Sequence, residues 1–185
     1  MTPQPAIIPP VFVDWLGDVV AVERHFEDAL DDQARKTSAP PIIMHLQDAV
    51  HDSRVRAEAF RDHYALSETL SVLQQGLDLF GKAVGLNEQI KTESVDKALR
   101  NDFVACNLAA VNYSMLHTTA IALENEGVAA FAAQGLRTYA TLIAEINAEL
   151  PGAVVRELVG ADSATPIDAN AAAIASSQQQ GLWFR

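Results

Sequence analysis

Acidic side chains on the inner side of a helix are the residues of this chain that could bind a metal ion. Glu23 shares a helical stripe with Val19, Phe26 and Leu30, because residues three, four and seven positions apart lie on the same side of a helix. Carboxylate oxygens that face a protein interior are suitable ligands for iron or manganese. Glu23 is therefore a candidate metal ligand. An equally weighted interpretation is an acid at the edge of the stripe that reaches water or pairs with an arginine.

A second group of polar residues lies in the most apolar part of the chain. Asn107, Ser114 and His117 fall on one strip of a helix that carries apolar residues in nearly every direction. Polar groups inside such a helix need hydrogen-bond partners, so we expect these three to form a satisfied buried polar network, with Glu23 as a further member. The sharper alternative is a pocket in which Glu23 and His117 bind one metal ion or a small polar ligand.

Two other candidates are better explained without chemistry. Asp48 and His51 have the spacing of a ligand pair, but they lie opposite the apolar stripe that contains Leu46, so the sequence places them on an outer face. Cys106 lies on the apolar helix, where a small buried core cysteine is expected rather than a nucleophile. No phosphate-binding glycine loop, nucleophile elbow or zinc-protease motif is present in the sequence.

Long amphipathic helices are expected to position these residues, since no segment shows the alternation of a strand. The expected fold class is all-α: an antiparallel four-helix bundle with short connections and a short fifth helix. Thr92 is expected to cap the third helix, Gly127 to end it, and Pro151 to end the fourth. A shorter connecting helix and loop are expected between residues 67 and 86. The helical stripes predict long helices over residues 12–30, 43–64, 93–126 and 128–150, and a short one over 153–159.

The chain divides into three parts. Residues 1–10 are expected to form an extended proline-rich arm, and residues 11–160 the helical bundle. Residues 161–185 are rich in Ala, Ser and Gln and are expected to form a flexible tail. That tail ends in Leu182, Trp183 and Phe184, an apolar group that could dock in a groove of the same chain, a second copy or another protein. A terminal turn packed on its own bundle carries equal weight.

Composition restricts the classes of function. The 185 residues include 49% hydrophobic and 20% charged residues, enough for one domain with a sizeable core. The formal net charge of −11 argues against binding to nucleic acid or to an anionic membrane. A single cysteine excludes an intramolecular disulfide, and no apolar run reaches the roughly 18 residues that a membrane span needs. The beginning of the chain lacks a basic targeting region, so we expect a cytoplasmic protein.

The order of several short motifs resembles the YciE/YciF family of ferritin-like proteins. Residues Asp14–His25 are similar to the opening helix of that family, and Glu23 takes the position of its metal-binding Glu. His45–Ala49, His-Leu-Gln-Asp-Ala, is similar to the family's His-Leu-Glu-Glu-Thr at the start of the second helix. Asn112–Tyr113 resembles the Ser/Ala-Tyr of the third helix, and Ala148–Pro151 the exit of the fourth.

The resemblance spans about Phe12 to Leu158 and implies a four-helix bundle with a fifth helix, often dimeric and associated with bacterial stress responses. A di-metal centre in such a fold takes one Glu from each of two helices and a Glu-x-x-His pair from each of the other two. Where the family carries its acids, this chain carries Cys106 and Ala109 on the third helix and Thr138–Ala140 on the fourth. One inward acid cannot hold two iron ions, so we expect the di-iron centre to be incomplete.

These observations lead to one expected function and two alternatives. The expected function is a non-enzymatic, stress-associated binding or structural protein, without a cofactor and forming a homodimer. The first alternative is a metal-dependent oxidase or peroxide-handling enzyme with a single iron or manganese ion at Glu23. The second alternative is a cargo protein that docks on a protein partner through its C-terminal tail.

Overall fold

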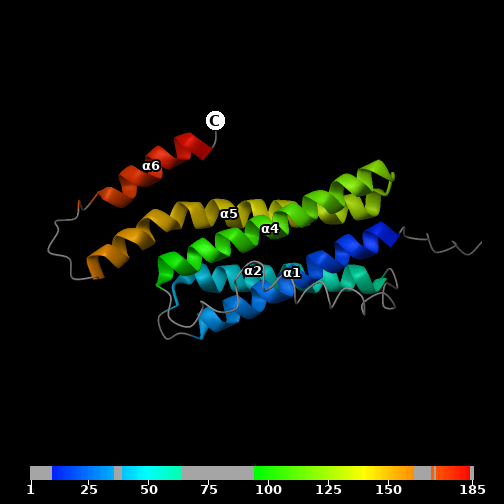
Figure 1. Cartoon of the computed structure of the whole chain (residues 1–185), viewed down its shortest axis with the longest axis horizontal. Coiled ribbons are helices and arrows are strands. Elements are labelled where there is room, and N and C mark those ends of the chain that lie inside the picture. The colour runs from blue at the N-terminus through cyan, green and yellow to red at the C-terminus, as the bar shows by residue number, and fades with distance from the viewer. Residues whose placement is uncertain (1–9, 36–38, 64–93, 161–167, 169, 184–185) are drawn as a thin grey trace, which may run out of the picture.

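The computed structural model describes residues 10–35, 39–63, 94–160, 168 and 170–183, with the side chains of 10, 11, 13, 14 and 180–183 left aside. Within these ranges the chain forms helices and no strands, which confirms the all-α prediction. The predicted connecting helix and loop at residues 67–86 lie outside the described residues. The helices are α1 (Pro10–Ala34), α2 (Pro41–His63), α4 (Val95–Ala122), α5 (Glu126–Gly160) and α6 (Ala171–Trp183), drawn in Figure 1. Among them none is both long enough and apolar enough to cross a membrane.

The four long helices of the described residues pack side by side, and each contacts two of the other three. Helix α1 packs against α2 and α4, while α5 packs against the same two helices from the other side. Contacts between side chains show that the neighbours are antiparallel: Glu23 of α1 meets Ser53 of α2, and Asp31, later in α1, meets Gln47, earlier in α2. Helix α4 is antiparallel to α1 as well, because Glu23 meets Tyr113 while Gln33, later in α1, meets Asp102, earlier in α4. Helices α2 and α4 therefore run in the same direction. The end of α2 and the start of α4 therefore lie at opposite ends of the assembly (Figure 1).

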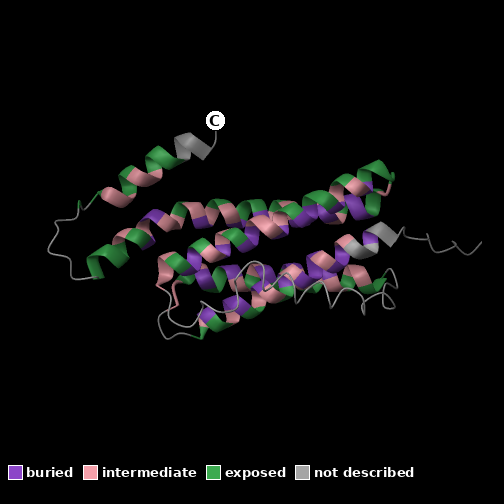
Figure 2. Cartoon of the chain, in the orientation of Figure 1, coloured by how far each residue is buried: buried purple, intermediate pink, exposed green. Residues whose placement is uncertain are grey.

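The core lies between these four helices and follows the stripes that the sequence predicts. On α1 the predicted core residues Val19, Phe26 and Leu30 are buried, and so are Leu46 and Val50 on α2. Figure 2 shows buried residues on the sides of the helices that face one another. Full burial of each large apolar side chain stabilises the fold by about 1.5–3 kcal/mol. Apolar burial, more than any single polar contact, therefore holds the helices together.

The turn between α4 and α5 differs from the prediction. Helix α4 ends at Ala122, and Leu123 follows as its C-terminal cap, so Gly127 does not end this helix and lies inside α5 instead. The left-handed residue of the turn is Glu124, with a φ of 53°. Asn125 then accepts a hydrogen bond of 3.0 Å from the backbone N–H of Val128. An asparagine in this position satisfies a free N–H at the start of a helix, which explains why α5 begins before the glycine.

Pro151 does not end the fourth long helix, contrary to the prediction. Helix α5 continues through it to Gly160, so the expected separate piece at residues 153–159 is the end of α5. A proline inside a helix removes one backbone hydrogen bond and costs about 3 kcal/mol. Pro151 and Ala153 are both buried, and this packing offsets the lost bond. The capping residue predicted for α4 also moves: Ser94 takes the N-cap position, while Thr92 lies outside the described residues.

The two ends of the chain are more helical than predicted. Pro10, expected in the extended arm, is the first residue of α1, where a proline is tolerated because the first N–H has no helical partner. Residues 171–183, expected in a flexible tail, form α6, which packs against α5 (Figure 1). Alanine has the highest helix propensity, and α6 begins with three alanines. The composition that suggested a tail is equally suited to a short helix.

A buried carboxylate as candidate functional site

Glu23 occupies the middle of the core and is fully buried. Its stripe neighbours Val19 and Phe26, one turn away on either side, are also buried, so the spacing that predicted an inward acid is confirmed by its position. Three hydroxyl groups, one from each of the other long helices, donate hydrogen bonds to the same oxygen, Glu23 Oε1. They are Ser53 Oγ of α2 at 2.6 Å, Tyr113 Oη of α4 at 2.9 Å and Tyr139 Oη of α5 at 3.0 Å. One atom thus connects all four long helices.

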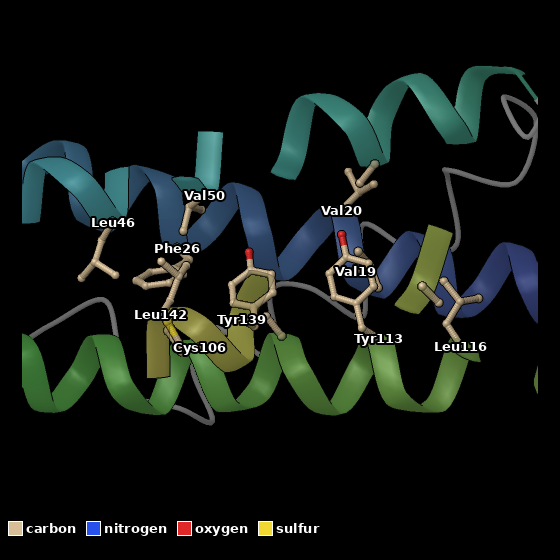
Figure 3. Close-up of a cluster of buried hydrophobic side chains, with 14 of the residues drawn as sticks. Val19, Val20, Phe26, Leu46, Val50, Cys106, Tyr113, Leu116, Tyr139 and Leu142 are labelled. Atoms are coloured by element: carbon tan, nitrogen blue, oxygen red, sulfur yellow. The ribbon is translucent and has the colours of Figure 1, made fainter. Parts of the chain in front are cut away.

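Packing around the two tyrosines fixes where their hydroxyl groups lie. Tyr113 and Tyr139 point the same way, toward α1 and α2 (Figure 3), and their ring centroids are 5.8 Å apart. Gly135 of α5 lies directly against the Tyr113 ring: a Cβ atom placed there would be 2.2 Å from Cε1 of Tyr113. Only glycine allows this approach. Because residue 135 has no side chain, the Tyr113 ring has room to lie where its hydroxyl group reaches Glu23.

The electrostatics of the site favour a carboxyl group that gains and loses a proton near neutrality. Burial raises the pKa of Glu23 from 4.5 to about 7, against the hydrogen bonds of the three hydroxyl groups and the charge of Arg56, which lower it. Burial, followed by the nearby Glu23 charge, also raises the pKa values of Tyr113 and Tyr139 above their ordinary range, so both remain neutral phenols. Since Oε1 already receives three donors, the proton of the neutral acid belongs on Oε2. That oxygen is buried and has no hydrogen-bond partner among the described residues.

The predicted pairing of Glu23 with His117 is not found. His117 is partly exposed on α4, and Glu23 meets Ser53, Tyr113 and Tyr139 rather than an imidazole. In the described part of the chain, no group of three His, Cys, Asp or Glu side chains is arranged to hold a metal ion. Neutral hydroxyl groups are weaker metal ligands than carboxylates or imidazoles. The polar surroundings of Glu23 thus fit a proton better than a metal ion.

The predicted buried network of Asn107, Ser114 and His117 is also wrong. Ser114 is exposed, and Asn107 donates a hydrogen bond of 2.7 Å to the backbone oxygen of Phe103 within its own helix. The buried side of α4 runs instead through Asp102, Cys106, Ala109, Tyr113 and Leu116. A helix that is apolar all round gives no unique inward direction from its sequence alone, and the predicted strip lies on the wrong side of α4.

A second buried polar contact escaped the prediction. Gln33 of α1 donates a hydrogen bond of 2.9 Å to Asp102 of α4, and both side chains are buried. Asp102 is three residues after Leu99 and four before Cys106, a spacing that could have identified it as an inward acid. Cys106 is buried, and burial, followed by the charge of Asp102, raises the pKa of its thiol. A thiol of raised pKa is a poor nucleophile, in agreement with a core cysteine.

Of the two polar residues predicted to lie outside, His51 belongs to an ion-pair cluster between α1 and α2. Asp48 and His51 are exposed, as predicted, and His51 Nδ1 lies 2.6 Å from Glu27 Oε1. Arg54 pairs with both Glu27 and Glu58. Burial acts to raise the pKa of Glu27, but hydrogen bonds from Arg54 and His51 outweigh it and hold the pKa below its ordinary value.

The predicted docking group at the C-terminus can be followed only in part. Leu182 and Trp183 belong to the last turn of α6, and their side chains are not among those described, while Phe184 lies outside the described residues.

Comparisons with known proteins give no relative for this chain. No protein-family model, curated protein or solved structure matches it.

Proposed function

We propose that this protein is a ferritin-like four-helix bundle whose centre holds a single carboxylate in place of a di-iron site, and that it acts as a non-enzymatic binding or structural protein, dimeric and associated with bacterial stress. The observation that carries the proposal is the set of three hydroxyl groups on Glu23 Oε1. A di-iron centre needs carboxylates or imidazoles from all four helices, and here α2, α4 and α5 present hydroxyl groups to the carboxylate of α1.

The arrangement of the helices supports the ferritin-like part of the proposal. Ferritin-like bundles differ from simple up-and-down bundles by one long crossover connection, which makes the second and third long helices parallel. In this chain α2 and α4 run in the same direction, and residues 64–93 connect them. This is the connection in which the sequence predicts a shorter helix and loop at residues 67–86, whereas the connections after α1 and α4 are short.

The alternative function is a single-ion oxidase or peroxide-handling enzyme, and one observation favours it. Oε2 of Glu23 is buried without a hydrogen-bond partner among the described residues, and an iron or manganese ion would satisfy it. Against this stand the raised pKa of Glu23, which makes a proton compete with the metal, and the neutral phenols beside it.

Metal analysis separates the two functions. The protein is purified from cells supplied with iron and manganese, and its metal content is measured by mass spectrometry beside two variants, Glu23→Gln and Glu157→Gln. Glu157 is exposed and serves as the control for metal bound loosely to an acidic surface. We expect a metal content far below one ion per chain that is equal in all three proteins. Near-stoichiometric metal that is lost only in Glu23→Gln would establish the metal-dependent alternative and overturn the proposal.

A further inference from the structure

Helix α4 carries large apolar side chains on the side that faces away from the core. We call Val104, Val111, Met115 and Ile121 the outer face of α4; their side chains are 46%, 53%, 37% and 60% exposed. Leu108, half-buried, lies between the first two. The positions 104, 108, 111 and 115 are separated by four, three and four residues, which is the spacing of helices that pack along each other in coiled coils. Figure 2 shows exposed turns along α4.

The outer face of α4 contains no charge. From Phe103 to Leu123 the sequence has no Asp, Glu, Lys or Arg, although one residue in five of the whole chain is charged. Two of its polar side chains form hydrogen bonds within the helix: Thr118 Oγ1 donates to the backbone oxygen of Ser114 at 2.8 Å, and Asn107 donates to that of Phe103. The centre of a protein interface is depleted of charged residues, and its polar groups need hydrogen-bond partners.

Charges return at both ends of this face: two basic residues outnumber Asp96 at the start of α4, and acidic residues follow its end. Lys97 and Arg100 are exposed at the start of α4, and Glu124 and Glu126 are exposed just after its end. An antiparallel pair of α4 helices centred between Leu108 and Val111 would place the two basic residues of each copy near the two acidic residues of the other. The same arrangement also opposes the two helix dipoles favourably.

We propose that the outer face of α4 binds the same face of a second copy of this chain, antiparallel and around a two-fold axis. A second copy also has a net charge of −11, so close approach is favourable only where the surface has no charge and where the charges at its ends are complementary. A two-fold interface is self-complementary, as this face is. The inference rests on the proposed dimeric role and deepens it by naming the surface. A dimer that persists in Val111→Glu would overturn this surface alone, whereas a monomeric natural protein would overturn the proposed dimer as well.

The first test places a charge in the middle of the face. Val111→Glu is compared with Val55→Glu, because Val55 on α2 is 45% exposed and offers a matched control on another surface. Light scattering is expected to show a dimer for the natural protein and for Val55→Glu, and a dissociation constant raised at least about 100-fold for Val111→Glu, since two carboxylates would face each other at the axis. Circular dichroism should show the same helix content in both variants.

Two outcomes of this test overturn the proposal. The interface is excluded if the natural protein is monomeric even at the highest protein concentration that can be measured. It is also excluded if the Val111→Glu variant remains dimeric.

The second test uses the charges at the ends and does not depend on the apolar stripe. The pair Lys97→Glu and Arg100→Glu is expected to weaken the dimer about tenfold, an effect typical of rim charges. Adding Glu124→Lys and Glu126→Lys to the same chain should restore the affinity, because the antiparallel pairs are then reversed rather than removed. If the fourfold variant dimerises no better than the double variant, the antiparallel arrangement is wrong.

Discussion

The α1–α2 pair and the α4–α5 pair are held together by different interactions. Between α1 and α2, Arg54 pairs with Glu27 and Glu58 pairs with Arg24 at 2.5 Å, while Arg54 and Glu58 pair with each other within α2. Between α4 and α5, contact is made by aromatic and small residues, with the Tyr113 ring against Gly135. Both pairs share the apolar core, but α1 and α2 are also joined by ion pairs at their surface, whereas the interior of the α4–α5 pair is packed more closely.

This difference between the two helix pairs is reflected in the groups that surround Glu23. The charged pair supplies the carboxylate of Glu23 and the hydroxyl group of Ser53, and the packed pair supplies the hydroxyl groups of Tyr113 and Tyr139. An acid can remain buried only where hydrogen-bond donors reach it, so each half provides what the other lacks. The two halves should therefore respond differently to pH, to added side-chain volume and to salt.

The largest effect is expected from the protonation of Glu23. Its pKa is 4.5 in the unfolded chain and about 7 in the folded protein, so as the pH rises the unfolded chain loses this proton first. Ionisation therefore favours unfolding above about pH 4.5, and the contribution of Glu23 to stability falls by about 3 kcal/mol between pH 4.5 and pH 8. The measurement is the free energy of unfolding in urea at several pH values, for the natural protein and for Glu23→Gln.

The variant isolates this contribution because its amide does not titrate. The difference between the natural protein and Glu23→Gln should decrease as the pH rises, while exposed Glu157→Gln should follow the natural protein throughout. Parallel pH profiles for the natural protein and Glu23→Gln would refute the raised pKa.

A smaller effect is expected from filling the space at Gly135. Gly135→Ala places a methyl group within 2.5 Å of three atoms of the Tyr113 ring, so the ring must move away from Gly135. Overpacking of this kind costs about 2 kcal/mol, measurable by denaturant unfolding. Gly152→Ala in the same helix is the control: its Cβ would meet only the flexible Arg156 side chain, at 3.2 Å, and the helix should gain slight stability. Equal effects of the two substitutions would argue against the close contact.

The smallest effect is expected from the ion-pair cluster. Arg54→Met removes the cation shared by Glu27 and Glu58, whose side chains are 16% and 22% exposed, and should cost about 1 kcal/mol at low salt. Because ions screen such pairs, the cost should shrink in about 1 M sodium chloride. Arg137 is exposed on α5, and Arg137→Met is expected to change the free energy of unfolding very little at either salt concentration. A cost that is independent of salt would mean that Arg54 acts through packing.

The sequence predicted the helices and the inward carboxylate well, for a simple reason. An amphipathic stripe such as that of α1 has one apolar side, so Glu23 could be placed between Val19 and Phe26 without any knowledge of the other helices. The partners of Glu23 could not be predicted, because Ser53 and Tyr113 meet it only after the axial positions of three helices are set.

The errors arose where local patterns compete with tertiary packing. Helix α4 is apolar on every side, so Asn107 and Ser114 were placed inside while Asp102 was missed. Pro151 was expected to end a helix on local grounds, but burial at that point continues α5. Where a helix ends depends on its packing against other helices, and the sequence of one segment does not reveal that packing.

The three hydrogen bonds on Glu23 Oε1 also have a mechanical consequence. A helix that slides along its axis by a single residue moves by about 1.5 Å, enough to carry a hydroxyl group from 2.9 Å to beyond hydrogen-bond distance. Apolar side chains tolerate such a slip, because one methyl group can replace another as a neighbour. The hydrogen bonds on Glu23 Oε1 therefore fix the axial positions of all four long helices. Apolar contacts alone would permit several such positions.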